Sequence, residues 1–357
     1  MKRVRVFHET NPTKYFGSLL RLQENHSISL SGLHRTSIIK EWLRSGIRDK
    51  IPLRERTRNA IEDLKARLQI PFLKNEVVII GMAPWDFRIL WFLMLKSTIN
   101  VIYHTSWHTW SDFEVPRRYG PLNFILRALW RRFLARRNVR VVAIHGEVAK
   151  SISRYFDGIN IEIEVIPHSI SPEFLVEREC VVSDKKKLLF VGELSRKKGV
   201  LDFSEYLINS NFDDCFLTVV GDGDLREEVV RLASVGGIRY EGKVRDRTVL
   251  ANIYSNNDFL IVPSIRVAGW EELFGMVIIE ALAAGLVVIS TDHIGPKTIF
   301  FGHDYPVFGE GEYETMMRFI ESLNPVDRMQ LLSAGKEIAM GYTPDVVDMK
   351  WMNYINA

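Results

Sequence analysis

The sequence predicts an α/β protein with two doubly wound parallel sheets. Short apolar runs that suit buried strands alternate with helical stretches in both halves of the chain, which is the order of βαβ units. Several of these runs end in a glycine turn, at the edge where an open parallel sheet places its ligand contacts. The 357 residues are also enough for two domains that each bury a core of their own.

Charge is distributed unevenly along the chain. The net charge is only +3, but residues 1–171 carry 28 Lys and Arg against 15 Asp and Glu, and the remainder carries 19 against 29. A basic half beside an acidic half indicates a side that meets anions, such as lipid head groups, nucleic acid or phosphorylated substrates. The composition, 46% hydrophobic and 25% charged, is typical of a globular protein and excludes a disordered or fibrous chain.

The cysteines and the apolar runs indicate the compartment. Cys180 and Cys215 lie outside any CxxC spacing, so a disulfide scaffold or a zinc site is not expected. Residues 1–10 alternate like a strand and lack the apolar run of a signal peptide, and the apolar runs are too short to span a bilayer. We therefore expect a cytoplasmic protein, either soluble or bound to the inner face of a membrane.

The first half begins with a strand, a loop and a helix that Gly17 opens. Residues 36–68 are helical in pattern and dense in Arg and Lys, for which a solvated basic face is the favoured interpretation. Another helix is expected at residues 88–95. The expected strands of this half are residues 4–7, 77–81, 100–103, 139–144 and 161–166.

Residues 121–137, PLNFILRALWRRFLARR, form a strongly amphipathic helix. Its apolar side is expected to consist of Leu122, Ile125, Leu126, Leu129 and Phe133. Packing of this side against a sheet is the favoured interpretation. Contact with anionic lipid through the arginines is the alternative.

His104 follows the strand expected at residues 100–103 and can offer a hydrogen bond to a sugar or phosphate oxygen. From position alone, the favoured alternative is a loop histidine whose hydrogen bonds are satisfied locally, or one packed in an aromatic cluster with Trp107 and Trp110. His104 and His108 are four residues apart, but neither an HExxH pattern nor a cysteine completes a coordination shell. We therefore expect no metal site.

In the second half, the expected strands are residues 188–191, 216–220, 240–244 and 259–262, and residues 184–187 form a linker before them. Three of these strands end at Gly192, Gly221 and Pro263, and the strand at residues 240–244 offers exposed backbone at Gly242, Lys243 and Val244. Arg196, Lys197 and Lys198 stand in the first of these turns, where three cations would neutralise a pyrophosphate. We therefore expect the strand ends to converge on one ligand site.

Residues 263–292 are the stretch around which this half is organised. A helix is expected at residues 276–284, starting from Gly275, and its free N–H groups suit a phosphate. Glu272 precedes the helix and Glu280 lies inside it, tilted back toward its N-terminus. The prediction is that two carboxylates and a phosphate cradle border one cleft.

The motifs FVGELSRKKG, VVGDGDL, YEGKV, VPS and WEELFGMVIIEALAAG occur in this order between residues 188 and 292. They resemble the donor domain of retaining glycosyltransferases of family 4, which have the GT-B fold of two Rossmann-like domains facing a central cleft. The segment from Glu272 to Glu280 is the most specific match. The first half is only loosely similar. The resemblance implies domains at residues 1–180 (acceptor) and 181–335 (donor), with a C-terminal helix in residues 336–357 that returns to the first domain.

The resemblance also implies roles for single residues. Glu280 would bind the ribose hydroxyls, Glu272 the donor sugar, and His104 would face the sugar from the other domain. Backbone amides of Phe274, Gly275, Met276 and Val277 would meet phosphate and sugar, and Lys243 and Val244 would meet the base. Arg196 or Lys197, with Lys198, would hold the pyrophosphate close to Gly192 and Gly221, so no metal or other cofactor is expected.

This chain departs from the family at two places. Glu193 stands where the family often has an arginine, so the phosphate-binding role moves to Arg196 and its neighbours. His293, Gly295 and Lys297 stand where the family commonly has a glycine pair and a glutamate, which changes one wall of the sugar pocket.

The leading hypothesis is transfer of a hexosyl or N-acetylhexosaminyl group, with retention, from a UDP- or GDP-linked sugar. The acceptor would be a glycan or a lipid-linked molecule, as in polysaccharide biosynthesis, and the basic half would meet an anionic membrane surface. A catalytically silent subunit that binds nucleotide sugar is the alternative. A nicotinamide-dependent dehydrogenase is disfavoured because no GxGxxG follows the first strand, and nucleic-acid binding is not expected because the arginines match no known motif.

Overall fold

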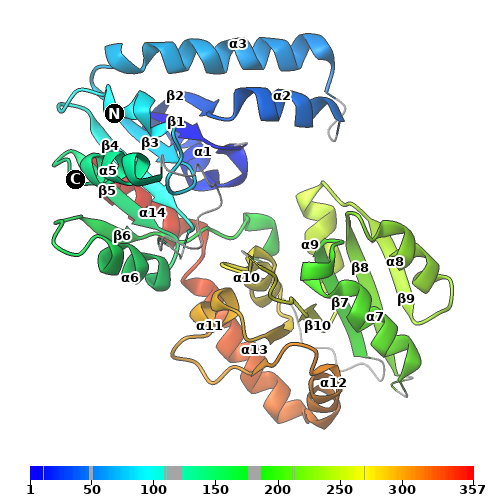
Figure 1. Cartoon of the computed structure of the whole chain (residues 1–357). Helices are drawn as coiled ribbons and strands as arrows, with labels where there is room; N and C mark the ends of the chain where they lie inside the picture. The colour runs from blue at the N-terminus through cyan, green and yellow to red at the C-terminus, as the bar shows by residue number, and fades with distance from the viewer. Residues whose placement is uncertain are drawn as a thin grey trace. The chain divides into compact units, whose positions relative to one another are not determined.

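The computed structural model describes residues 1–10, 12–47, 51–107, 110, 123–175, 186–210, 212, 214–268 and 270–357 (Figure 1). The chain divides into two compact units. Unit 1 comprises Met1–His168 and Val347–Ala357, and unit 2 comprises Ser169–Val346. The domain boundary expected at residues 180 and 181, and residues 184–185 of the expected linker, lie outside the described residues.

Unit 1 is built on a parallel sheet with the strand order β2-β1-β3-β4-β5-β6. Its strands are β1 (Lys2–His8), β2 (Ile28–Arg35), β3 (Glu76–Gly81), β4 (Asn100–Thr105), β5 (Val139–Ala143) and β6 (Ile163–Val165). Every residue of β3 is buried, because helices cover both faces of a doubly wound sheet and the strand must be apolar on each side. His104 lies inside β4, one residue further into the sheet than the sequence indicated.

The helices of unit 1 follow the strands in the expected alternation. They are α1 (Gly17–Glu24), α2 (Ile38–Ile47), α3 (Leu53–Gln69), α4 (Ile89–Leu93), α5 (Asn123–Leu134), α6 (Gly146–Tyr155) and α14 (Pro344–Asn356). The last of these comes from the C-terminus. Val347 and Trp351 of α14 belong to the same core as Val4 and Phe16, and Asp348 forms an ion pair of 2.6 Å with Arg21.

Helix α5 packs into unit 1 through one apolar side. Leu126, Trp130, Phe133 and Leu134 are buried, which supports the packing interpretation of this helix. The predicted apolar side was partly wrong, since Ile125 is 42% exposed while Trp130, the largest of the buried residues, was not included in it. Leu122 lies outside the described residues.

Unit 2 has a second parallel sheet, with the order β12-β11-β10-β7-β8-β9. Its strands are β7 (Lys186–Glu193), β8 (Cys215–Asp222), β9 (Ile238–Gly242), β10 (Phe259–Val262), β11 (Val287–Thr291) and β12 (Val307–Phe308). Residues 186 and 187 of the expected linker belong to β7. The chain leaves β7 toward β8 and β9 and then crosses to β10 on the other side, so the strand order reverses between β7 and β10. Ligands of open α/β sheets bind at such a switch point.

Helices flank the second sheet as well. They are α7 (Val200–Asn209), α8 (Arg226–Ala233), α9 (Arg247–Ser255), α10 (Met276–Ala283), α11 (Ile294–Ile299), α12 (Tyr313–Ser322) and α13 (Pro325–Met340). The predicted architecture of two parallel sheets with alternating helices is therefore confirmed (Figure 1). Within the described part of the chain, no helix is both long and apolar enough to cross a membrane.

Candidate functional site

The loops that follow β7 and β10 touch at the switch point of unit 2. Gly199, at the end of the turn with the three cations, has φ 65°, and a Cβ there would lie 1.8 Å from the carbonyl oxygen of Pro263. The backbone N–H of Ile265 donates to the carbonyl of Lys197 at 2.9 Å. Only glycine allows this approach, so the two loops form one surface at the carboxyl ends of the central strands.

The end of β8 joins the same edge of the sheet. Gly192 and Gly221 are paired in register at the ends of β7 and β8. Gly221 has φ 153°, and a Cβ there would lie 1.9 Å from the carbonyl oxygen of Gly192. The two predicted glycines therefore lie side by side because their backbones must approach more closely than any side chain permits.

Lys198 and Glu272 are brought together by these loops. The Lys198 ammonium contacts the Glu272 carboxylate, and both side chains are mostly buried. The same ammonium lies 5.0 Å from the centroid of the Trp270 ring, and that of Lys197 lies 5.1 Å from it. Both cations therefore lie close to the same aromatic ring, an arrangement stabilised by the ring quadrupole. Arg196, the third cation of the turn, is exposed.

His293 contacts the loop that carries Glu272. This ring is fully buried; its Nδ1 accepts the backbone N–H of Glu272 at 3.1 Å, and its Nε2 lies 2.9 Å from the Ser264 carbonyl. Because Nδ1 accepts, the proton of the neutral ring sits on Nε2 and is donated to Ser264. Burial lowers the pKa of His293, which favours this neutral form. His293 thus holds together two parts of the loop between β10 and α10, at Ser264 and Glu272.

The start of α11 adds two further bonds to this loop. The N–H of Ile294 donates to Glu271 Oε2 at 3.2 Å, and the N–H of Gly295 donates to the carbonyl of Glu272 at 2.8 Å. Arg266, which lies in the same loop as Glu272, forms ion pairs of 3.0 Å with Asp292 and 2.6 Å with Glu310. Two of the three residues that depart from the family pattern here, His293 and Gly295, therefore support the Glu272 loop.

Glu280 is paired away from the other predicted site residues. It is only 4% exposed; Arg247 donates to one carboxylate oxygen at 2.7 Å and the Tyr254 hydroxyl donates to the other at 3.1 Å. Burial raises the pKa of Glu280, although Arg247 and Tyr254 oppose the shift. Burial and the charge of Glu280 also raise the pKa of Tyr254 well above its usual value, so this hydroxyl remains a donor.

The start of α10 has the predicted geometry. Gly275 precedes the helix with φ 71°, and the helix ends before Gly285, which has φ 78°. The first-turn amides, including those of Met276 and Val277, have no partner within the helix and carry the positive end of its dipole. Phe274 is 7% exposed and packs against Tyr342, so it contributes backbone rather than side chain to this surface.

The remaining predicted residues belong to other elements. Lys243 is exposed and Val244 half-buried just after β9. His104 lies in unit 1, 5% exposed, with its ring 4.9 Å from Phe16 and 5.8 Å from His168. Burial and repulsion from His168 and His8 lower the pKa of His104 well below its usual value, so the ring is neutral. His108 lies outside the described residues.

The side chains of the candidate site that the sequence did not indicate are partners of the two glutamates. Nothing in the local pattern marks Arg247 and Tyr254, which lie 33 and 26 positions before Glu280. His293 was noted only as a departure from the family. Among the described residues, no group of three or more His, Cys, Asp or Glu side chains is arranged to hold a metal ion.

Comparison with solved structures defines the fold. The chain is similar over its whole length to HepE of Anabaena, crystallised with UDP and glucose (TM-score 0.63, 14% identity, all of both chains). It is also similar to WaaG, a glycosyltransferase involved in lipopolysaccharide biosynthesis (0.62, 13%, all of both chains). For sucrose-phosphate synthase of Thermosynechococcus elongatus the TM-score is 0.68 at 14% identity, over all of this chain and 98% of that one. The chain has the GT-B fold, as predicted.

Sequence comparison finds a family match that lies in unit 2. Residues 185–323 match the family model described as glycosyl transferases group 1. The chain is 30% identical over 141 residues to 2-deoxystreptamine N-acetyl-D-glucosaminyltransferase of Niallia circulans (38% of this chain, 35% of that one). It is 31% identical over 175 residues to phosphatidyl-myo-inositol mannosyltransferase of Mycobacterium leprae (45% and 44%). The matches span less than half of these relatives.

Proposed function

We propose that the protein is a retaining glycosyltransferase of family 4, which moves a hexosyl or N-acetylhexosaminyl group from a UDP- or GDP-linked sugar. The observation that carries the proposal is the contact between Lys198 and Glu272 at the switch point of unit 2. Glu272 lies four residues before α10, whose N-terminus has no side-chain cap. These groups lie inside the segment that matches group 1 glycosyl transferases. HepE, which shares the fold, was crystallised with UDP and glucose.

In this proposal the site stabilises a leaving diphosphate. Lys198, Lys197 and Arg196 supply positive charge, and the first amides of α10 supply fixed dipoles where negative charge develops. These groups do the work that a magnesium ion does elsewhere, so we propose a reaction without a metal cofactor. Glu272 accepts hydrogen bonds from the sugar hydroxyls, and its contact with Lys198 ties sugar recognition to diphosphate recognition.

Two further roles follow the family resemblance. Glu280 binds the ribose, for which a hydroxyl of the ribose replaces the Arg247 or Tyr254 partner that the carboxylate has now. His104 faces the donor sugar from unit 1 as a neutral ring, able to donate one hydrogen bond and accept another. Lys243 and Val244 meet the base through their backbone.

We propose a glycan or lipid-linked acceptor at the inner face of a membrane. The basic first half of the chain supports this, because it favours anionic surfaces and phosphorylated acceptors. Relatives point the same way by name, among them the mannosyltransferase of M. leprae, and TuaC of Bacillus subtilis, a putative teichuronic acid biosynthesis glycosyltransferase. The alternative function is a silent subunit that binds nucleotide sugar for a partner enzyme.

The first test is thermal unfolding of the full chain with UDP, GDP, UDP-glucose, UDP-N-acetylglucosamine and GDP-mannose. A ligand that binds only the folded state raises Tm, and slow release of free sugar from a donor that binds shows that the chain is active alone. Stabilisation without sugar release would favour the silent subunit. Absence of any shift with every nucleotide would contradict the proposal.

The second test compares Lys198→Met with Lys336→Met, a matched change at an exposed lysine of α13. Loss of a charge-assisted contact to the diphosphate should lower turnover roughly 10- to 100-fold in the first variant, and the second should match the wild type. Equal turnover of the two variants would remove Lys198 from the site.

A further inference from the structure

Helices α2 and α3 lie side by side in unit 1 (Figure 1). They expose a set of aliphatic residues, here called the α2–α3 face. Its members are between 46% and 77% exposed. They are Ile39, Leu43 and Ile47 of α2 and Leu53, Ile61, Leu64 and Leu68 of α3. Neighbouring members are three, four or eight residues apart, which places each set on one side of its helix.

Both helices bury polar residues and expose aliphatic ones, whereas an ordinary surface helix does the reverse. The residues that α2 buries are Glu41 and Ser45, and those that α3 buries are Asp63 and Ala66. Asp63 is held in place because its carboxylate accepts the backbone N–H of Arg35 at 3.0 Å. This hydrogen bond keeps the polar side of α3 turned toward the rest of unit 1, and the aliphatic side is exposed to water. Such exposure is unfavourable for a protein that stays in solution.

Contacts between the helices fix their orientation. Trp42 of α2 donates its indole N–H to the Thr57 hydroxyl of α3 at 3.2 Å. The Arg56 guanidinium lies 4.2 Å from the centre of the Trp42 ring and donates to the Trp42 carbonyl at 3.3 Å. The two aliphatic rows are therefore held as one surface.

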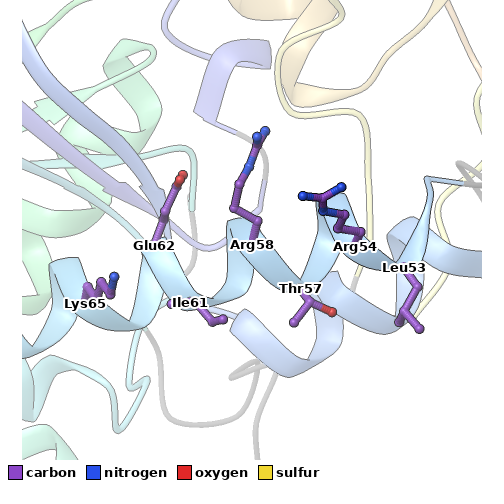
Figure 2. A pocket seen from close by; sticks show the side chains of 7 residues that line it. All are labelled: Leu53, Arg54, Thr57, Arg58, Ile61, Glu62 and Lys65. Atoms are coloured by element: carbon purple, nitrogen blue, oxygen red, sulfur yellow. The ribbon is translucent and has the colours of Figure 1, made fainter.

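Cations line the α2–α3 face. Lys40 and Arg44 follow the aliphatic row of α2, and Arg54, Arg58 and Lys65 follow that of α3; all five are exposed. The exposed acids of the two helices are Glu55 and Glu62. A hollow of about 590 Å³ along α3 is lined by Leu53, Thr57 and Ile61 together with Arg54, Arg58, Glu62 and Lys65 (Figure 2).

The chemistry of this face fits lipid better than protein or nucleic acid. Protein interfaces are enriched in Tyr and Trp, whereas the exposed rows hold only Ile and Leu, with Phe72 just beyond α3. Nucleic acid would use the cations but leave the aliphatic rows in water. A helix that lies in a bilayer surface buries an apolar side and sets Lys and Arg against anionic head groups.

We propose that the α2–α3 face docks unit 1 onto an anionic bilayer, with both helices parallel to the membrane plane. This inference deepens the membrane contact of the proposed function by assigning it to α2 and α3. Helix α5, the other candidate, buries most of its apolar side against the sheet. Binding of the bilayer does not depend on the transferase activity, so the two can fail separately.

The test is co-sedimentation of the full chain with vesicles of phosphatidylcholine, alone or with about a third phosphatidylglycerol, the anionic lipid that attracts basic surfaces. Binding is expected with the anionic vesicles only and should weaken as salt rises. Lys40→Gln/Arg44→Gln should weaken binding roughly 30-fold, from about fivefold per cation. Ile39→Gln/Ile47→Gln should weaken it at least about tenfold, because the inserted side becomes polar.

The control is Arg131→Gln/Arg132→Gln, which removes two exposed arginines of α5 and should leave binding unchanged. Far-UV circular dichroism and the Tm shift with nucleotide confirm that each variant is folded. Three results would overturn the inference: no binding of the folded wild type to anionic vesicles, stronger loss in the α5 variant than in the α2 variants, or an aliphatic row that closes a dimer in solution without binding lipid.

Discussion

Replacement of His293 tests whether this buried ring positions the Glu272 loop. In the wild type, Nδ1 accepts the Glu272 N–H at 3.1 Å and Nε2 donates to the Ser264 carbonyl at 2.9 Å. His293→Ala removes both bonds and leaves a small void, since the ring is fully buried. The expected result is a looser Glu272 and a less stable unit 2.

The magnitude follows from what each partner retains. The Ser264 carbonyl also accepts the Thr291 hydroxyl at 2.8 Å, so it keeps one bond. No other partner is recorded for the Glu272 N–H within the described residues, and leaving it unpaired costs about 1–3 kcal/mol. With about 1 kcal/mol for the lost Ser264 bond and about as much for the void, His293→Ala should lower the free energy of unfolding by roughly 3–5 kcal/mol.

Two isosteric variants separate positioning from packing. In His293→Asn the side-chain oxygen replaces Nδ1 as acceptor for Glu272, and in His293→Gln the side-chain amide replaces only the donor to Ser264. The Asn variant should keep donor-sugar affinity near the wild type, while the Gln and Ala variants weaken it. Denaturant unfolding and calorimetric titration with the donor that stabilises the wild type measure both effects. Loss of less than about 1 kcal/mol in His293→Ala, or equal donor affinity of the Asn and Gln variants, would refute the reasoning.

Two further predictions concern pH and a buried ion pair. Burial lowers the pKa of His8 to about 4 and those of His104 and His293 below the usual value of 6.5. Below pH 6.5 the unfolded chain therefore binds more protons than the folded one. The free energy of unfolding is highest above pH 6.5, and it falls by up to about 1.4 kcal/mol per histidine and pH unit as the pH drops toward the folded pKa. Chemical denaturation between pH 8 and 5 checks this, and a stability that rises on acidification would contradict it. Asp86→Ala removes one carboxylate from Arg88, which is 6% exposed and keeps Glu9, at 2.9 Å, and the Ser37 hydroxyl. The loss should cost about 1.5–3 kcal/mol. Arg318→Ala, at the exposed pair with Glu314, should leave the denaturation midpoint unchanged; similar midpoints for both variants would show that burial of the Asp86 pair contributes nothing.

Three of the predicted strands of unit 2 lie within observed strands, because parallel strands are buried on both faces and must be continuous apolar runs. The strand expected at residues 240–244 was wrong by two residues, since β9 is Ile238–Gly242 and its sequence, IRYEG, is no apolar run. Residues 259–262 were placed without error, and α10 begins after Gly275 as expected. By contrast, β2 was not predicted. Its residues Ile28–Arg35 are mostly half-buried at the edge of the sheet and include Ser, Gly and His, so they carry no apolar run.

The candidate site was predictable where glycines and cations follow strands, and not where partners come from distant elements. The residues of the turn after β7 and of the Glu272 loop were both identified, and the structure brings Lys198 onto Glu272, 74 positions away. The pairing of Glu280 with Arg247 and Tyr254 left no local signal, because a carboxylate on a helix gives no indication of which neighbouring helix it meets. The predicted roles of Glu280, His104 and Lys243 in donor binding remain predictions.

The sequence pattern also could not predict that the α2–α3 face is exposed. The pattern of residues 36–68 predicted helices with a basic surface, and the cations are indeed exposed. Helical spacing, however, places Ile39, Leu43 and Ile47 in one row without saying whether that row faces the core. Only the packing of Glu41 and Asp63 toward unit 1 shows that it faces outward.

The sequence by itself determined the alternation of strands and helices, the glycines at the strand ends and the order of the motifs, since these follow from burial and backbone geometry within a few residues. The tertiary structure alone decided which charges pair. The structure pairs His293 with the Glu272 backbone, Lys198 with the Glu272 carboxylate, and Arg247 with Glu280. These contacts depend on how β7, β10 and β11 and the segments that follow them lie beside one another. The partners are close in space but far apart along the chain.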